Sequence, residues 1–475
     1  MTELLKPDLC VIGAGSGGLS VAAAAAQLGV PVVLIEKAVM GGDCLNHGCV
    51  PSKSLIASAR RAHEMRSAKP LGITPTNPMI NLRFVHEHVR GVIAAIAPND
   101  SVERFTGLGV RVIQAPARFV DRETVEAGDY QVKARRFVVA AGSSPALPPI
   151  PGIDTVSVLT NETIFALAER PQHLVVVGGG PIGIELAQAH LRLGCRVTVI
   201  EAMKALGLGD PELTAPLIAE LREEGLTLVE GAKVERFERT EGGINVHMSH
   251  GGRSETVAAS HVLMATGRRA NVDNLGLDQA GIRYDKSGIR VSRGLRTSNR
   301  RVYAIGDVTG GPQFTHAASY QAGIVIRSAL FRLPARVNPD IMPWVTFTDP
   351  ELAHVGLSED EARKRHGRRI SVVRWPYHEN DRAQTERRTH GFVKVVTTPS
   401  GRILGASILG AHAGELIQMW ALAITAGLSM KHMASVIAPY PTFSEINKRA
   451  AYAYYLPRLA NPMVRSLVSL LRKLG

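Results

Sequence analysis

The sequence has little cysteine, few aromatic residues and no long apolar run. Four cysteines in 475 residues are too few for the disulfide framework of a small secreted protein. No window offers the about 20 uninterrupted apolar residues that a membrane-spanning helix needs. The opening residues, MTELLKPDLCVIGAG, run directly into an apolar strand and lack the basic and then apolar pattern of a secretion signal. We therefore expect a cytoplasmic protein with about two to four domains.

Basic residues exceed acidic ones, which gives a formal net charge of +13. The excess is mostly arginine, scattered along the chain, and it can attract anionic cofactors, substrates or surfaces. Aromatic residues make up 5% of the chain and no nucleic-acid-binding motif is present, so we expect no nucleic-acid partner.

Two of the cysteines, Cys44 and Cys49, lie in the segment GGDCLNHGCVPSK at 41–53. Positions five apart on an ideal α-helix are about 8.7 Å apart at Cα, whereas a disulfide needs about 4.4–6.8 Å. The pair can therefore bond only if the helix is distorted at 46–48, which Asn and Gly permit. So small a loop is a poor structural staple, and zinc would need two further ligands. We favour a redox pair, while an inert reduced pair and a metal site stay open.

Other residues near the motifs receive simpler interpretations. Asp43 is expected to cap the helix that carries the cysteines. His47 is expected to face solvent in a turn, or else to tune Cys44. Cys10 and Cys195 fall in or beside apolar strands, where free cysteine behaves as a small hydrophobic residue, so both are expected to be packing residues.

Two segments repeat one design: a short apolar strand, a glycine-rich turn, a helix, and a second strand that ends in glutamate. The first copy has its strand at 9–12 and the turn GAGSGG, and the second has its strand at 174–177 and the turn GGGPIG. In each copy the glutamate lies 23 residues after the first glycine. The residues of the pattern are Gly13, Gly15, Gly18 and Glu36 in the first copy and Gly178, Gly180, Gly183 and Glu201 in the second.

The glycines of this pattern let the backbone turn tightly and approach a pyrophosphate, which rests on the N-terminus of the following helix. The glutamate accepts hydrogen bonds from a ribose. A single GxGxxG would be weak evidence, but here each copy has its strand, helix and acid in order. Two dinucleotide sites on one chain indicate electron transfer between the two dinucleotides.

Two further apolar strands end in distinctive residues. Residues 138–141 lead to Gly142 and Ser143, just before the proline-rich crossing PALPPIPG at 145–152. Residues 303–306 lead to Asp307, which can hydrogen-bond a ribityl hydroxyl near the pyrophosphate or act as an ordinary turn aspartate.

With these motifs in place, the sequence resembles the pyridine nucleotide–disulfide oxidoreductases, in the group of dihydrolipoamide dehydrogenase, glutathione reductase and mercuric reductase. The resemblance extends from Leu9 to about Ala450, and it includes the cysteine segment, AAGSSP, MATGR at 264–268, YAIGD and YPTFSE at 440–445. It implies an α/β fold with two Rossmann-like dinucleotide-binding domains, for FAD and NAD(P), and a C-terminal α+β dimerisation domain. The expected parts are an FAD-binding domain at 1–151 and 271–339, an NAD(P)-binding domain at 152–270, a dimerisation domain at 340–460 and a basic amphipathic tail at 461–475.

The resemblance also implies which residues hold the cofactors. FAD would be held by the first glycine-rich turn and its glutamate, together with Lys53, Gly142 and Asp307. NADH, or NADPH as the alternative, would be held by the second turn and Glu201, together with Gly267. A carboxylate at the end of the second strand favours NADH because it repels a 2′-phosphate. No metal ligands are expected.

The same resemblance implies roles in the reaction. Cys49 would face the flavin as the charge-transfer thiolate, and Cys44 would be the exposed thiol that attacks the substrate. Lys53 would lie near the flavin and pair with Glu185, where its charge stabilises the reduced flavin and lowers the pKa of the adjacent thiol.

One position departs from the disulfide-reducing members, which carry a histidine five residues before a glutamate as acid and base. Here Tyr440 replaces the histidine, and Glu445 is kept. Tyrosine titrates near about 10 and histidine near about 6.5, so Tyr440 is a poor cycling base. Mercuric reductases also place a tyrosine there, but residues 446–475 lack the C-terminal cysteine pair of those enzymes.

The expected function is electron transfer from NAD(P)H through FAD to a Cys44–Cys49 disulfide and on to a small-molecule or protein disulfide. Reduction of mercuric or another metal ion, or of a quinone, is the alternative. A flavin-carrying subunit that depends on a protein partner is a third interpretation. The family's geometry implies a homodimer with active sites shared between subunits.

The tail NPMVRSLVSLLRKLG at 461–475 has apolar residues at helical spacing, three basic residues and no acid. Packing of its apolar face on the dimerisation domain is the main expectation. Weak peripheral contact with an anionic bilayer is the alternative. The apolar positions are Met463, Val464, Leu467, Val468, Leu471 and Leu474.

Overall fold

The computed structural model describes residues 3–167, 169–459 and 461–474. Contacts between residues divide the chain into two compact units. The first unit comprises Met1–Ala59, Met79–Ala202 and Val229–Val337, and the second comprises Arg60–Pro78, Met203–Leu228 and Asn338–Gly475. In the described residues no helix combines the length and apolarity needed to cross a bilayer.

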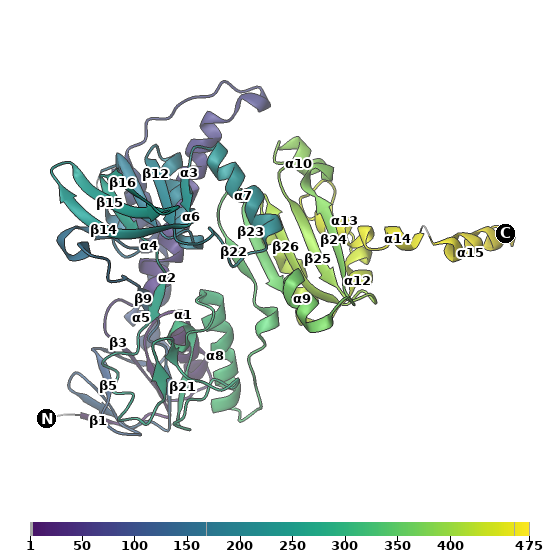
Figure 1. Cartoon of the computed structure of the whole chain (residues 1–475). Coiled ribbons are helices and arrows are strands. Elements are labelled where there is room, and N and C mark those ends of the chain that lie inside the picture. Colours follow the sequence, from purple (N-terminus) through teal and green to yellow (C-terminus); the bar gives the residue numbers. More distant parts are fainter. Residues whose placement is uncertain (1–2, 168, 460, 475) are drawn as a thin grey trace. The chain divides into compact units, whose positions relative to one another are not determined.

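The first nucleotide-binding motif lies in a parallel sheet of order β21-β8-β2-β3-β4 (Figure 1). Successive residues of its central strand point to opposite faces, and both faces are buried, which explains why the strands are apolar throughout. Helices α1 (Ser16–Gln27) and α8 (Thr315–Ala329) pack against each other beside it. The strands are β2 (Leu9–Ile12), β3 (Val32–Glu36), β4 (Arg111–Gln114), β8 (Arg136–Val139) and β21 (Val302–Ala304).

The second motif lies in another sheet of the same unit, of order β10-β17-β11-β12-β13. Helix α6 (Pro181–Arg192) connects its β11 and β12, which pair in parallel. An antiparallel sheet, β14-β15-β16, follows in the chain. The strands are β10 (Val158–Leu159), β11 (His173–Val177), β12 (Arg196–Glu201), β13 (Thr227–Glu230), β14 (Ala232–Thr240), β15 (Gly243–His250), β16 (Arg253–Ala259) and β17 (His261–Met264).

Smaller elements complete the first unit. They are the sheets β1-β7-β6-β5, β18-β9 and β19-β20, and the helices that follow the first motif. The strands are β1 (Glu3–Leu5), β5 (Ala117–Phe119), β6 (Val125–Ala127), β7 (Tyr130–Val132), β9 (Ser143–Pro145), β18 (Arg268–Ala270), β19 (Tyr284–Asp285) and β20 (Gly288–Ile289), and the helices are α2 (Gly42–Asn46), α3 (Cys49–Arg66, which continues into the second unit), α4 (Leu82–Ile96) and α5 (Val102–Gly107).

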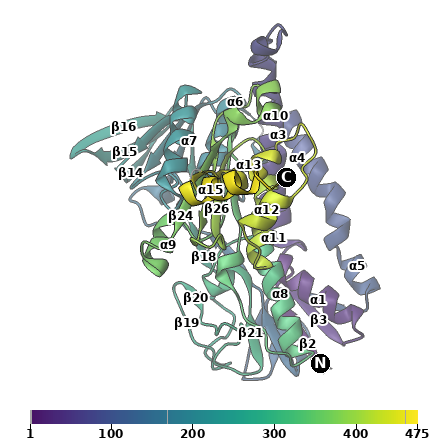
Figure 2. The same ribbon diagram turned by 90° about the vertical axis from the view of Figure 1, so that its right-hand side faces the viewer.

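The second unit is built on an antiparallel sheet of order β22-β23-β26-β25-β24 (Figure 1). Figure 2 views this unit with helices α12, α13 and α15 toward the reader. Every residue of β26 is buried, because α11 and α13 pack on the sheet and α7 also contacts this strand. The elements are β22 (Trp344–Thr346), β23 (Glu351–Gly356), β24 (Ser371–Pro376), β25 (Phe392–Thr397), β26 (Ile403–Gly410), α7 (Pro211–Glu223), α9 (Glu359–His366), α10 (Asp381–Thr385), α11 (Ala413–Thr425), α12 (Met430–Ser435), α13 (Glu445–Ala453), α14 (Leu456–Leu459) and α15 (Pro462–Leu471).

The described architecture confirms the expected fold class: two Rossmann-like nucleotide-binding regions and a C-terminal α+β region. The domain boundaries expected from the sequence divide the chain by the cofactor that each part binds, whereas the two compact units divide it by contacts between residues. The expected boundaries therefore stay a prediction.

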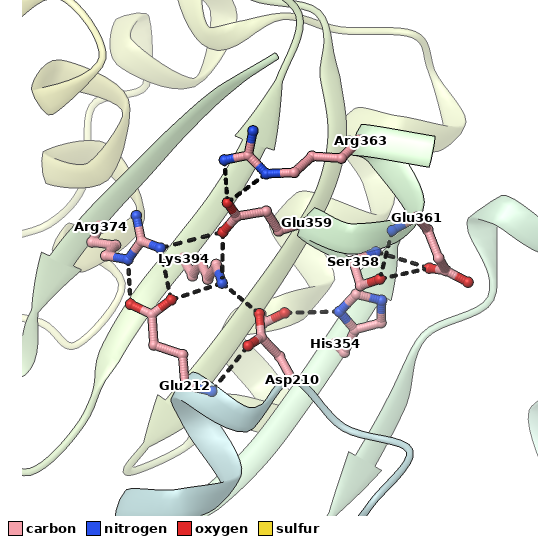
Figure 3. Close-up of polar contacts among 10 residues, drawn as sticks. Asp210, Glu212, His354, Ser358, Glu359, Glu361, Arg363, Arg374 and Lys394 are labelled. Carbon is pink, nitrogen blue, oxygen red and sulfur yellow. Dashed lines mark hydrogen bonds and ion pairs between the residues drawn. The ribbon is translucent and has the colours of Figure 1, made fainter. Parts of the chain in front are cut away.

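Lys394 on β25 is the centre of a charge cluster in the second unit (Figure 3). Its side chain is 4% exposed, and its ammonium lies 2.6 Å from Asp210, 2.8 Å from Glu212 and 2.9 Å from Glu359. Asp210 also caps the N-terminus of α7, and Arg374 binds Glu212 through two guanidinium nitrogens. The cluster therefore ties α7, α9 and two strands of the sheet together.

The cluster also shifts the pKa of its members. Burial alone would lower the pKa of Lys394, but hydrogen bonds to the three carboxylates more than offset it, so the pKa is raised. Hydrogen bonds, first from Arg374 and then from Lys394, hold the pKa of Glu212 at about 2. Removing the ammonium would leave carboxylates without their buried counter-ion.

We predict that Lys394→Met lowers the free energy of unfolding of the second unit by about 3 kcal/mol, the lower end of the range for breaking a buried ion pair, because Glu212 is partly exposed. All three tryptophans, Trp344, Trp375 and Trp420, belong to this unit. Tryptophan fluorescence during urea unfolding therefore reports on it. Exposed Lys431 is the matched control, and an equal loss in Lys431→Met would contradict the assignment to the cluster.

Candidate functional site

The two glycine-rich turns have the same backbone geometry. Gly13 and Gly178 have φ of +104° and +111°, and a Cβ on either would lie within 2.4 Å of a carbonyl oxygen, that of Ala140 or Ala265. Positive φ and this close approach both require glycine. The third glycine of each turn packs equally closely on the first, so helix and strand meet without space for a side chain.

The second glycine of each turn faces open space. A Cβ on Gly15 would approach no atom closer than 4.0 Å, and one on Gly180 would meet nothing within 4 Å. These residues are the N-caps of α1 and α6, and neither helix has a side chain bonded to its first N–H groups. Uncapped N–H groups with the positive end of the helix dipole form an anion site. Each turn therefore fits a dinucleotide pyrophosphate.

The glutamate of each copy is bonded to its own turn. Glu36 accepts hydrogen bonds from the N–H of Ala14 at 2.6 Å and of Ala38 at 2.8 Å, and Glu201 accepts one from the N–H of Gly179 at 2.6 Å. A carboxylate has about four acceptor positions, so ribose hydroxyls can bind the remaining ones. Both glutamates lie where the sequence motif expects a ribose contact.

The cysteine segment is broken between its two thiols. Helix α2 ends at Asn46 and α3 begins at Cys49, so His47 and Gly48 interrupt the helix as a disulfide would require. Cys44 is partly buried and Cys49 is exposed, the reverse of the order of exposure expected from the resemblance, and both are free thiols. The prediction that Asp43 caps the helix was wrong: the N-cap is Gly41, whose φ of +87° is left-handed, and Asp43 lies inside the first turn.

A hydrogen bond between the two thiols shifts their pKa values in opposite directions. A hydrogen bond from Cys44 lowers the pKa of Cys49 to about 6, with further lowering by Thr315 and Lys53. The same interaction raises the pKa of Cys44, and burial adds to it. Asp43 raises the pKa of both through charge repulsion. The hydrogen bond therefore favours Cys49 over Cys44 as the thiolate of the reduced pair. The role of Cys49 beside the flavin stays a prediction.

Lys53 and Glu185 meet as an ion pair. The Lys53 ammonium lies 2.7 Å from the Glu185 carboxylate, whose side chain is 6% exposed. Lys53 is one helical turn after Cys49 on α3, and Glu185 is in the first half of α6. The pair connects the cysteine helix to the helix of the second glycine-rich turn, and the role of Lys53 beside the flavin stays a prediction.

A second polar cluster fixes the cysteine segment, and sequence reasoning did not single out two of its five members, Arg268 and Asn161. Arg268 binds Asp43 at 3.2 Å and donates hydrogen bonds to the hydroxyl and carbonyl of Ser143. The Ser143 hydroxyl donates to Asp307 at 2.6 Å. Asn161 donates to Asp43 and to the carbonyl of residue 47. Burial raises the pKa of Asp307, against the opposing effect of Ser143 and Arg268.

Gly142 and Gly267 lie where the chain passes between the two nucleotide-binding regions. Both have positive φ, +69° and +105°, and a Cβ on either would meet nothing within 4 Å. Thr315, the first residue of α8, lies 3.4 Å from the Cys49 sulfur and was not expected from the sequence. In the sequence, Thr315 could have been recognised as a polar residue at the start of an apolar helix.

Cys44 and Thr315 line a cavity of about 370 Å³ in the first unit. Its wall combines apolar side chains of α1 and α4, including Leu19 and Ile96, with one acid and one base, Asp100 and Arg104.

Tyr440 and Glu445 belong to the second unit. Tyr440 is 70% exposed, and its hydroxyl donates a hydrogen bond to Asp381 at 3.0 Å. This bond raises the pKa of Tyr440, which makes it still less suited to act as a base near neutral pH. Glu445 is the first residue of α13. Cys10 and Cys195 are buried, and desolvation raises the pKa of both, which confirms them as packing residues.

The chain belongs to the pyridine nucleotide-disulphide oxidoreductase family: that family matches residues 7–322, and its dimerisation domain matches residues 342–451. Members use FAD and take electrons from NAD(P)H. The chain is therefore an FAD-dependent pyridine nucleotide-disulfide oxidoreductase, as the motifs predicted.

Curated relatives carry two different names. A dihydrolipoyl dehydrogenase of Staphylococcus aureus is 36% identical over 456 residues, which cover 94% of this chain and 96% of the relative. Mercuric reductases of Staphylococcus aureus and Streptomyces lividans are 33% and 34% identical, with 94% of this chain covered in each and 82% and 96% of the relative.

Solved structures agree with this placement. The HOCl-induced flavoprotein disulfide reductase RclA of Escherichia coli superposes with a TM-score of 0.84 at 28% identity, covering 94% of this chain and 99% of that one. LpdA of Mycobacterium tuberculosis gives a TM-score of 0.87 at 29% identity with the same coverage.

We predict that the reduced protein shows one thiolate that titrates near pH 6 and is lost in Cys49→Ser. Cys44→Ala removes the hydrogen bond that stabilises this thiolate, so its pKa should rise toward the ordinary thiol value. Asp43→Asn removes a repulsive charge, so the pKa should fall. The pH dependence of the ultraviolet thiolate absorbance measures all three. A Cys49 titration that is unchanged in Cys44→Ala would contradict the thiol–thiolate bond.

Proposed function

We propose that the enzyme oxidises NADH and reduces a small disulfide, with Cys44 as the thiol that attacks the substrate. The observation that carries this proposal is the asymmetry of the pair: Cys44 hydrogen-bonds Cys49 and lowers its pKa, and Cys44 itself lines a cavity. FAD, when bound, accepts two electrons from the nicotinamide and passes them to the cysteine pair. The glycine-rich turns and their glutamates hold the two dinucleotides.

The protons of the thiol steps are supplied by the pair itself and by one proton from solvent. The Cys44 proton passes to the Cys49 thiolate, and the Cys44 sulfur attacks one sulfur of the substrate disulfide to form a mixed disulfide; the leaving thiolate takes that proton from Cys49 and departs as the first thiol. The Cys49 thiolate then attacks the Cys44 sulfur and closes the Cys44–Cys49 disulfide, and the second leaving thiolate takes a proton from solvent. With NADH as donor, one NADH, one proton and one disulfide give NAD⁺ and two thiols.

Reduction of a thiophilic metal ion is the second candidate. Tyr440 stands where a cycling histidine would assist dithiol chemistry, and its hydrogen bond to Asp381 makes it a weaker base. The relatives named mercuric reductase are as similar overall as the dihydrolipoyl dehydrogenases. A metal ion would be the substrate here, bound by the two thiols.

The dimerisation domain supports a homodimer. We infer that each subunit contributes Tyr440 and Glu445 to the cysteine pair of the other, as the family resemblance implies. We also propose a cytoplasmic location, because two buried free thiols and a cysteine pair that must cycle suit a reducing compartment.

The acceptor is tested by supplying purified enzyme and NADH with small disulfides, lipoamide, quinones or Hg(II) and following NADH oxidation. We expect turnover with a small disulfide, and a fall of more than about 10³-fold in Cys44→Ala because the nucleophile is lost. Quinone reduction should persist in that variant, since it needs no thiol attack. Turnover with Hg(II) alone would favour the second candidate, and absence of any turnover without an added protein would contradict both.

The donor is tested at Glu201. We expect kcat/KM to favour NADH, because the carboxylate bonds a 2′-hydroxyl and repels a 2′-phosphate. Lys204, three residues on, makes the preference modest. Glu201→Gln removes the charge but keeps an acceptor for the N–H of Gly179, so the glycine-rich turn should keep its shape. The ratio of kcat/KM for NADH to kcat/KM for NADPH should fall by roughly tenfold. A native preference for NADPH would overturn the proposal.

A further inference from the structure

The C-terminal helix α15 (Pro462–Leu471) presents an apolar face that no described residue of the chain covers. Asn461 caps it through the N–H of Met463 at 2.9 Å, and none of its residues is buried. Large aliphatic side chains stay 38–79% exposed along it and the next turn. They are Met463, Val464, Leu467, Val468, Leu470, Leu471 and Leu474.

These positions fall on one side of the helix at 3.6 residues per turn. Arg465, Ser466, Ser469, Arg472 and Lys473 share the opposite side. The two sets do not interleave, so the helix is amphipathic along its full length. The sequence interpretation that the face packs on the dimerisation domain is not what the structure shows: the apolar side chains of α15 are exposed, and among the described residues the core of that domain reaches only to Tyr455.

The charge around this face has one sign. Residues 446–475 contain six Arg and Lys residues and no Asp or Glu. A second copy of the chain would cover the apolar face but would bring the same positive charge beside it. An anionic bilayer covers the face and neutralises the charge together.

We propose that α15 lies in the headgroup region of an anionic membrane, with its aliphatic side in the acyl boundary and Arg465, Arg472 and Lys473 against lipid phosphates. This attaches the reductase to a membrane surface as a peripheral protein. The inference is independent of the acceptor, because it rests on the helix and not on the cysteine pair.

The test uses the FAD-loaded enzyme and co-sedimentation with vesicles of phosphatidylglycerol and phosphatidylcholine, or of phosphatidylcholine alone. The native protein should sediment with the anionic vesicles and remain in the supernatant with the neutral ones. A chain that ends at Ala460 and the variant Leu467→Ser/Leu471→Ser should both stay in the supernatant, with flavin content and NADH oxidation unchanged.

Charge is tested with matched variants. The variant Arg465→Glu/Arg472→Glu/Lys473→Glu should bind the anionic vesicles more weakly. Neutralising one charge should lower the affinity by about fivefold, and reversing it should lower the affinity further. Arg253→Glu/Lys286→Glu/Arg336→Glu makes the same change in net charge at exposed positions outside the helix and should sediment like the native protein.

Three outcomes would overturn the proposal. One is equal sedimentation of native and truncated protein, and another is no sedimentation of the native protein with anionic vesicles. The third is a smaller oligomer for the truncated chain in light scattering without lipid, which would show that the face packs on a second copy.

Discussion

Glu185 is almost completely buried, and the Lys53 ammonium holds its carboxylate at 2.7 Å. A buried carboxylate without a counter-ion is costly, so this pair constrains where α3 can lie against α6. Cys49 is one turn before Lys53, and the second glycine-rich turn opens α6. One interaction thus sets the position of the cysteine pair relative to the second glycine-rich turn. The same ammonium lowers the pKa of Cys49, so it couples architecture to thiol chemistry.

Around this ion pair the chain repeats one hydrogen-bonding arrangement. In each nucleotide-binding region a glutamate at the end of a strand accepts a hydrogen bond from the N–H that follows the first glycine, and so holds the turn in shape. The helix N-terminus beyond it is left uncapped. The first copy leads to the cysteine segment, and the second leads to Glu185.

Local pattern predicted the parts of the site that depend on local backbone. The glycines and Glu36 were predictable because a strand, a turn and a helix fix them within 23 residues. Asp43 is a residue for which local sequence pattern gave the wrong prediction. Its sequence context favours a helix cap, but Arg268, distant in sequence, binds it inside the first turn. Thr315 and Lys394 are similar cases, because their partners arrive through tertiary packing rather than through spacing along the chain.

In the proposed function, two electrons from the nicotinamide reduce the Cys44–Cys49 disulfide to a dithiol. The direct measurement is a titration of the oxidised enzyme with NADH in the absence of any acceptor. New thiols are trapped with an alkylating reagent and located by peptide mass spectrometry. We predict two new thiols for each NADH consumed, on Cys44 and Cys49, with Cys10 and Cys195 unchanged. NADH oxidation without new thiols on that pair would contradict it.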